Sequence, residues 1–138
     1  MLRGFATINY WADDVGAAAD WYAELLGQRP YFERPGPTGR PAYVEFRVGD
    51  HQAELGIIDR AYAPAEASVD GPGGAVMHWH VDDLEDTVER LLAMGARVYQ
   101  PVTPRGDSGF VTASVVDPFG NVLAVMYNPH YLETVAAG

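Results

Sequence analysis

The chain has 138 residues, 48% of them hydrophobic, a length that fits one soluble domain, and no apolar run reaches the roughly 18 residues of a membrane span. Its formal net charge of −10 argues against binding to nucleic acid or to an anionic membrane surface, because both require a basic surface. It has no cysteine, and all nine of its cationic side chains are arginines, so disulfides, thiolate chemistry and lysine Schiff bases are excluded. Residues 1–5 lack the layout of a signal peptide, and we expect a cytoplasmic protein.

The first half of the chain predicts one helix and four strands. Asp14 can cap a helix over residues 15–26, whose apolar residues recur at a spacing of three to four, and Gly27 stands where a left-handed C-cap is expected. The alternation of apolar and polar residues, together with turn residues such as Gly49-Asp50, predicts the strands. These strands are residues 7–12, 29–34, 42–48 and 52–58.

The second half repeats this pattern after a connection at about residues 59–74, which has no sustained period. Asp83 lies 69 residues after Asp14 and can cap a helix over residues 84–94, which Gly95 ends. The predicted strands are residues 76–81, 97–101, 109–116 and 122–127, followed by a tail at 129–138. The repeat predicts two equivalent strand-helix-strand-strand-strand modules.

Side-chain alternation divides each predicted strand into two faces. One face is strongly apolar and is expected to pack on the helices; it comprises Ile8, Tyr10, Val44, Phe46, Leu55, Ile57, Met77, Trp79, Val111, Ala113, Val115, Leu123 and Val125. The other face is half polar, as expected of a face that lines a ligand cavity. Its residues are Thr7, Asn9, Trp11, Tyr43, Glu45, Glu54, His78, His80, Phe110, Thr112, Ser114 and Ala124.

Several short motifs occur in a fixed order along the two modules. They are Asp14 with Trp21-Tyr22 and Leu25-Leu26-Gly27, then Val81-Asp82-Asp83-Leu84, Met94-Gly95-Ala96-Arg97-Val98 and Asp117-Pro118-Phe119-Gly120-Asn121. In order and spacing they resemble the vicinal oxygen chelate superfamily, which groups glyoxalase I, bleomycin-resistance proteins and extradiol dioxygenases. The resemblance covers nearly the whole chain and leaves out its last residues.

The resemblance implies an α+β fold in which paired βαβββ modules form a cup-shaped mixed sheet with helices on its outer face. Module one would span about residues 5–58 and module two about 75–128 of a single domain over residues 1–138. Many members of the superfamily are homodimers, so we expect a homodimer that binds a small molecule and neither nucleic acid nor membrane.

Enzymes of the superfamily hold a divalent metal through His, Glu or Gln on the first and last strands of each module. Carried over by counting, those positions fall on Thr7, Val76 and Ala124 and at or near Glu54. Valine and alanine have no donor atom, and threonine is a poor ligand for these metals. We therefore predict no metal at the family position and no cofactor.

Two functions are consistent with the residues of the half-polar face that is expected to line a ligand cavity. The first is binding of a small, aromatic or planar molecule in the cup without a metal, in which Trp11 and Phe110 would stack on the ligand or merely fill space. The alternative is a lyase, isomerase or ring-cleaving dioxygenase that holds one divalent metal with His78, His80 and Glu54, or that uses one histidine as a base. Both histidines could equally be neutral residues hydrogen-bonded in a polar cavity. A pure interaction module would leave the histidine-bearing face unexplained.

Overall fold

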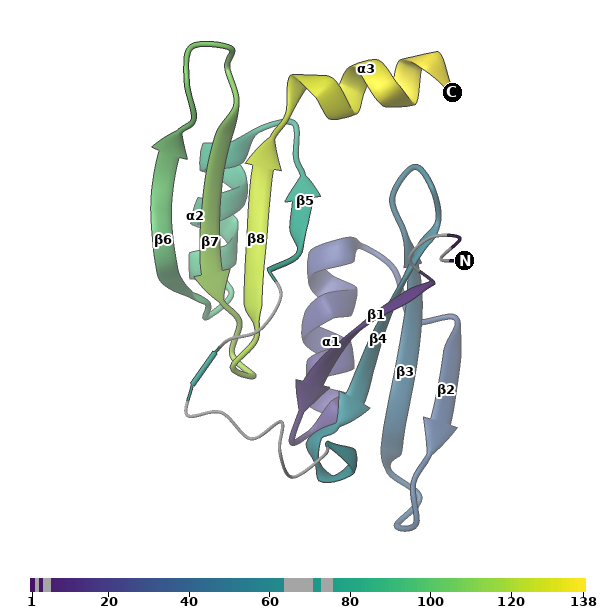
Figure 1. Ribbon diagram of the computed structural model, residues 1–138. Coiled ribbons are helices and arrows are strands. Elements are labelled where there is room, and N and C mark those ends of the chain that lie inside the picture. Colours follow the sequence, from purple (N-terminus) through teal and green to yellow (C-terminus); the bar gives the residue numbers. More distant parts are fainter. Residues whose placement is uncertain (2, 4–5, 64–70, 73–75) are drawn as a thin grey trace. The chain divides into compact units, whose positions relative to one another are not determined.

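The structure is a computed structural model that describes residues 1, 3, 6–63, 71–72 and 76–138. The chain divides into two compact units, Met1–Ser68 and Val69–Gly138, which we call module one and module two. Each module contains a four-stranded mixed sheet with a helix against one face (Figure 1). The α+β class and the βαβββ order of both modules are confirmed.

Module one forms a sheet with the strand order β1-β4-β3-β2. Strand β1 runs parallel to β4, and the other neighbours are antiparallel. Its elements are β1 (Thr7–Ala12), α1 (Val15–Leu26), β2 (Phe32–Pro35), β3 (Pro41–Val48), β4 (Ala53–Asp59) and the short 3₁₀ helix η1 (Arg60–Tyr62). The predicted helix is confirmed, and three of the four strands lie within one residue of the predicted bounds, whereas β2 begins three residues later than predicted.

Helix α1 begins and ends where the cap residues stand. The side chain of Asp14 accepts a hydrogen bond from the Ala17 N–H at 2.9 Å, and Gly27 adopts the left-handed conformation with φ of 70°. The helix packs against β3 and β4, and the rings of Tyr22 and Tyr10 lie 5.8 Å apart across this contact. The core consists of buried residues from both layers: Tyr10, Val15, Ala18, Ala19, Tyr22, Val44, Phe46, Leu55 and Ile57.

Module two repeats this topology with the strand order β5-β8-β7-β6 and a parallel pairing of β5 with β8. Its elements are β5 (His78–His80), α2 (Leu84–Ala93), β6 (Arg97–Pro104), β7 (Val111–Val116), β8 (Val122–Tyr127) and α3 (Pro129–Ala137). Asp83 caps α2 by accepting a hydrogen bond from the Asp86 N–H at 3.0 Å. Buried Asp117 accepts hydrogen bonds from the Phe119 and Asn121 N–H groups and so fixes the turn between β7 and β8.

The predicted division into two faces is confirmed for most apolar positions. Nine of the thirteen residues assigned to the helix-packed face are buried, and the other four, Ile8, Met77, Trp79 and Val111, are half-buried. In helix α2, Leu92 is 39% exposed. Helix α2 therefore rests on Leu84 and Leu91, which are buried.

Four elements of module two differ from the sequence prediction. Strand β5 covers only His78–His80 of the predicted residues 76–81, and β7 begins at Val111 and not at residue 109. Strand β6 continues to Pro104, where a loop was predicted from residue 102. This edge strand tolerates its prolines because it is paired only with β7, with register shifts on either side of Gln100. Residues 129–137, predicted as a tail, form helix α3, which begins at Pro129 and is capped by Asn128.

None of the helices in the described part of the chain is long and apolar enough to cross a membrane.

Candidate functional site

The face of the module one sheet that is opposite α1, which we call the front face, carries three rows of side chains. The register of the four strands defines them: Trp11, Ile58, Tyr43 and Arg34 form one row, Asn9, Gly56, Glu45 and Phe32 the central row, and Thr7, Glu54 and Arg47 the third. Six residues predicted as ligand-binding therefore share one surface: Thr7, Asn9, Trp11, Tyr43, Glu45 and Glu54.

Gly56 is the floor of this surface. It is buried, and a Cβ atom at this position would overlap Asn9 Oδ1 and would lie 2.7 Å from the Tyr43 hydroxyl. Asn9 and Tyr43 thus converge from neighbouring strands over a position that has no side chain. A glycine in the interior of a strand marks a close approach of this kind.

Glu45 is the centre of a hydrogen-bonded network. The Tyr31 hydroxyl donates to one of its carboxylate oxygens, and the Tyr43 hydroxyl donates to the other. Tyr31 precedes β2, and its backbone N–H donates to the Glu45 carbonyl at 3.0 Å, which brings the phenol onto the front face. The Phe32 and Tyr43 rings lie edge to face with centroids 6.2 Å apart.

These contacts fix the charges of the network. Desolvation alone would raise the pKa of Glu45, but the hydrogen bonds from Tyr31 and Tyr43 and the positive charge of Arg47 outweigh it, so the pKa is lowered. Desolvation and the hydrogen bond to Glu45 raise the pKa of Tyr43. The hydrogen bond to Glu45 also raises the pKa of the exposed Tyr31 hydroxyl. At neutral pH the network therefore holds one carboxylate and two neutral phenols.

The third row carries a second carboxylate with its own partners. Glu54 accepts a hydrogen bond from the Thr7 hydroxyl at 3.0 Å and lies 3.4 Å from the Arg47 guanidinium. Arg47 also covers the Tyr31 ring at 4.4 Å from its centroid. Thr7 and Glu54 stand at two positions where the superfamily places metal ligands. Here they are hydrogen-bonded to each other, and Glu54 also pairs with Arg47.

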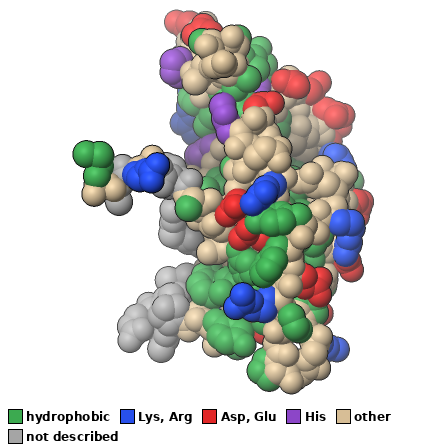
Figure 2. Space-filling view, turned by 90° about the vertical axis from the view of Figure 1, so that its right-hand side faces the viewer, with side chains coloured by type: hydrophobic (Ala, Val, Ile, Leu, Met, Phe, Trp, Pro, Cys, Tyr) green, Lys and Arg blue, Asp and Glu red, His purple; other side chains and the backbone are tan. Residues whose placement is uncertain are grey.

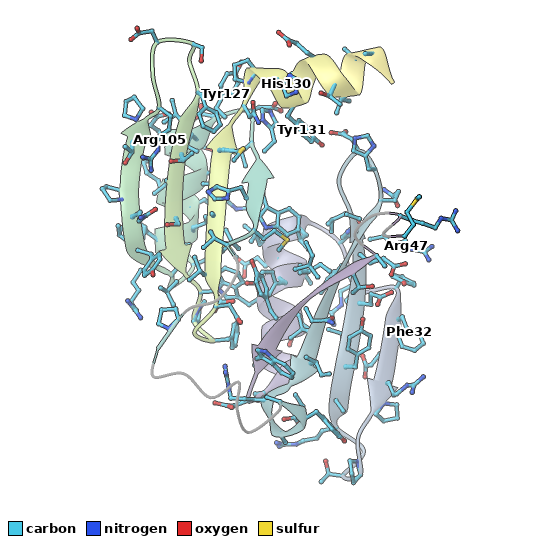
Figure 3. All side chains as sticks on the ribbon, in the orientation of Figure 1. Phe32, Arg47, Arg105, Tyr127, His130 and Tyr131 are labelled. Carbon is cyan, nitrogen blue, oxygen red and sulfur yellow. The ribbon has the colours of Figure 1, made fainter. Side chains whose placement is uncertain are left out.

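The exposed side chains on the β2 side of module one are mixed in kind. Figure 2, which views the molecule from that side, shows hydrophobic, acidic and basic side chains interleaved over the lower part of the view. Tyr31 is 49% exposed and Phe32 is 40% exposed, so both present aromatic surface to solvent. Figure 3 labels Phe32 on β2 and Arg47 on β3, the two strands that carry this part of the face.

The two histidines of module two have different environments, although both were predicted to line a cavity. His78 is exposed, whereas only 7% of the His80 side chain is exposed. The His80 ring stacks on Tyr131 of α3 at 4.8 Å with an interplanar angle of 15°, and it lies 5.6 Å from the Tyr127 ring. Figure 3 labels Tyr127 at the end of β8 and Tyr131 on α3, the two elements that enclose this imidazole.

The hydrogen bonds of His80 fix its tautomer and argue against metal ligation by this residue. Its Nδ1 accepts a hydrogen bond from the Asn128 N–H at 3.1 Å, so a neutral ring carries its proton on Nε2. Buried Nε2 has no hydrogen-bond partner and lies 3.5 Å from Asp82 Oδ1. Neither ring nitrogen therefore offers a lone pair to a metal. Among the described residues, no three His, Asp or Glu side chains are grouped so that they could hold one.

The remaining predicted residues of module two lie in its inner strands β7 and β8 or, in the case of Phe110, immediately before β7. Thr112, Ser114 and Ala124 are buried, Phe110 is half-buried, and the Thr112 hydroxyl accepts a hydrogen bond from Arg105 Nε at 3.1 Å. The register pairs Ala124 with His78, whereas counting from the helix cap had placed the equivalent first-strand position on Val76. The alternative metal set combines these histidines with Glu54 of module one, and it stays a prediction.

Module two also has a small cavity at the start of α2. Its volume is about 300 Å³, and it is lined by Asp82, Asp83, Leu84, Glu85, Val111 and Tyr127. Asp83 is already engaged as the helix cap, and the positive end of the helix dipole opposes a bound cation. None of its lining residues was among the predicted site residues.

The sequence prediction missed Tyr31, Phe32, Arg47 and Gly56, which complete the front face of module one. Tyr31 and Phe32 fall within the predicted strand 29–34, but its pairing with residues 42–48 was not predicted, so neither residue was placed beside Glu45. The available signal was the Tyr31-Phe32 doublet beside a strand that already carried Tyr43 and Glu45 on its polar face.

Comparison with known proteins identifies the family but no curated relative. No curated protein matches the chain. Among solved structures, a glyoxalase-related enzyme from Fulvimarina pelagi is 22% identical with a TM-score of 0.70, covering 93% of this chain and 90% of that one. A glyoxalase/bleomycin resistance protein from Catenulispora acidiphila is 23% identical with a TM-score of 0.60, covering 89% and 96%. TioX from Micromonospora sp. ML1 is 19% identical with a TM-score of 0.65, covering 90% and 98%.

These structural similarities support the fold that the two βαβββ modules display. The family model for the Glyoxalase/Bleomycin resistance protein/Dioxygenase superfamily matches residues 4–125, which is most of the chain. The chain therefore belongs to the Glyoxalase/Bleomycin resistance protein/Dioxygenase superfamily.

Proposed function

We propose that the protein binds a small planar molecule on the front face of module one. The observation that carries this proposal is the convergence of Asn9 and Tyr43 over Gly56, beside the exposed Phe32 ring. A planar ligand could stack on the Phe32 ring, with the Tyr43 ring, inclined by 61° to Phe32, at its edge, while Asn9 offers an amide donor and acceptor. No metal takes part in this function.

The exposed aromatic side chains favour ligand binding energetically. Tyr31 is 49% exposed and Phe32 is 40% exposed, and since fully burying such a side chain is worth about 1.5–3 kcal/mol, covering the exposed part of each ring stabilises a complex by about 1 kcal/mol. The hydrogen bonds of Glu45 hold the Tyr31 and Tyr43 phenols in place before any ligand arrives. This preorganisation lowers the entropy that binding would cost.

Membership of a superfamily that includes bleomycin-resistance proteins supports small-molecule binding in general terms. The metal-dependent alternative has weaker support, because His80 is enclosed by α3 and both of its ring nitrogens are unsuited to metal ligation. The cup that would join the two sheets and the homodimer both stay predictions, and neither is needed for binding to this face.

The test is calorimetric titration of the wild type with a panel of planar aromatic compounds, among them quinoline. We expect at least one compound to bind and Phe32→Ala to weaken it at least about tenfold, which corresponds to about 1.4 kcal/mol. Tyr99→Ala is the matched control, because Tyr99 is 46% exposed but lies on β6 of module two. Equal losses in Phe32→Ala and Tyr99→Ala, or no binding by any compound, would refute the proposal.

A further inference from the structure

The front face of module one combines an ionised carboxylate with three aromatic rings. Tyr31, Phe32 and Tyr43 surround Glu45, with centroid distances of 6.5 Å between Tyr31 and Phe32 and 6.2 Å between Phe32 and Tyr43. Hydrogen bonds from two neutral phenols lower the pKa of Glu45, and they stabilise its negative charge without cancelling it. We call Tyr31, Phe32, Tyr43 and Glu45 the aromatic–carboxylate cluster.

Two of these rings already carry planar cations that belong to the chain itself. The Arg47 guanidinium lies 4.4 Å from the centroid of Tyr31, and the Arg34 guanidinium lies 5.9 Å from the centroid of Phe32. Both distances are within the roughly 6 Å over which a ring face attracts a cation. The two guanidinium groups show which kind of charge and shape these ring faces accept.

The two arginines differ in how firmly they are held. Arg47 is also within ion-pair distance of Glu54, at 3.4 Å, and stays with that carboxylate. Arg34 is exposed on the edge strand β2 and lies at the outer limit of the contact with Phe32. A ligand that covered Phe32 would replace Arg34 and would lie beside Glu45, which is paired with Phe32 on the neighbouring strand.

We infer that the ligand of this face is a planar organic cation, which stacks on the Phe32 ring and meets the inclined Tyr43 ring at its edge, with its positive charge beside Glu45. The inference rests on the proposed function and adds the charge class of the ligand. The net charge of −10 works in the same direction, because it attracts cations and repels anions over the whole chain.

The experiment compares three planar probes of similar shape: N-methylquinolinium, quinoline and naphthoate, which are cationic, neutral and anionic at neutral pH. We expect N-methylquinolinium to bind at least about tenfold tighter than quinoline, and naphthoate to bind most weakly. Added salt should weaken binding of the cation and leave quinoline unchanged, since only charged pairs are screened. This comparison within the wild type does not depend on the folding of any variant.

Two substitutions test the assignment of the charge. Glu45→Gln should reduce the preference for N-methylquinolinium over quinoline to about twofold or less, because the attraction between the Glu45 carboxylate and the cation is removed. Glu33→Gln is the matched control; Glu33 lies on β2 opposite Val44, whose side chain packs on the other face, and its removal should keep the preference. Arg34→Met should tighten binding of the cation, because it removes the competing guanidinium.

The outcomes separate this inference from the proposed function. If quinoline binds as tightly as N-methylquinolinium and Phe32→Ala weakens both, the ligand need not be a cation and the inference is wrong. The proposed site for a planar ligand would then still hold. Tighter binding of naphthoate than of either other probe would also overturn the charge class. If none of the three probes or the other panel compounds binds, the proposed function fails and the inference fails with it.

Discussion

Modules one and two share a topology but differ in how exposed the polar side chains of their sheets are. In module one, the polar and aromatic side chains Tyr31, Tyr43 and Glu45 bind to one another and stay at least partly exposed. In module two, Thr112 and Ser114 are buried, and His80 is enclosed beneath α3. A repeated scaffold therefore fixes where a side chain can project, and its neighbours decide whether it can meet a ligand.

The largest predicted change in the free energy of unfolding concerns the two histidines of β5. His80→Ala removes the stack on Tyr131 and the acceptor for the Asn128 N–H, and it should lower the free energy of unfolding by about 1–3 kcal/mol. His78→Ala, at an exposed position on the same strand, should change it by less than about 0.5 kcal/mol.

Hydrogen exchange of the α3 amides measures this effect directly. In His80→Ala, residues 131–137 should exchange faster than in the wild type, while α2 should be affected less. Unchanged protection of α3 in His80→Ala would contradict the role of His80 as its anchor. A comparable loss in His78→Ala would show that the two histidines are not distinguished as the structure indicates.

A smaller effect is expected at the floor of module one. Gly56→Ala forces Asn9 and Tyr43 apart, and overpacking of this kind costs about 1–2 kcal/mol. Binding of planar compounds should be lost in the same variant, because Tyr43 is displaced. Chemical denaturation and calorimetry measure the two effects.

The control for Gly56→Ala is the same substitution in α1. A Cβ atom at Gly16 would meet only Asp14 Oδ1 at 3.5 Å, an ordinary contact, and alanine favours the helix by up to about 1 kcal/mol. Gly16→Ala should therefore stabilise the protein and leave binding intact. Full binding of a planar compound by Gly56→Ala would contradict the proposed floor.

The smallest effect is a change in pH dependence. Because the pKa of Glu45 is lowered in the folded state, its contribution to stability is present above the unfolded value near 4.3 and is lost as the pH falls through the folded pKa. Tyr43→Phe removes one donor, so the pKa of Glu45 should rise and stability at neutral pH should fall by less than about 1 kcal/mol.

A carbon-detected NMR titration of the Glu45 carboxyl group measures this shift. Tyr62→Phe is the control, since Tyr62 is 55% exposed on η1 and should leave the Glu45 titration unchanged. A midpoint in Tyr43→Phe at or below that of the wild type would show that the Tyr43 hydroxyl does not stabilise the carboxylate.

Much of the scaffold could be predicted from the sequence, because local chemistry determines it. The caps at Asp14 and Asp83 place both helices, and the alternation in β3 assigns Val44 and Phe46 to the core. The same alternation places Tyr43 and Glu45 on the opposite face of module one, which is where the structure has them.

The site itself was less predictable, because it depends on contacts between distant segments. Side-chain alternation predicted on which face of the sheet His80 lies, but it did not predict that α3 covers this residue. Residues 129–137 have no strong apolar period, and none of them is buried. Tyr31 lies just before β2, although the predicted strand 29–34 included it, and side-chain alternation along that strand does not show that its hydroxyl reaches Glu45.

The most direct test of ligand binding by module one, and not by module two, is an NMR titration of the ¹⁵N-labelled chain with N-methylquinolinium and quinoline. Gly56 of β4 and Ala124 of β8 serve as reporters, one on each sheet. We predict that the amide signals of Gly56, Phe32 and Tyr43 shift with saturation and that the signal of Ala124 does not. Saturable shifts at Ala124 and His78 with none at Gly56 would contradict this prediction.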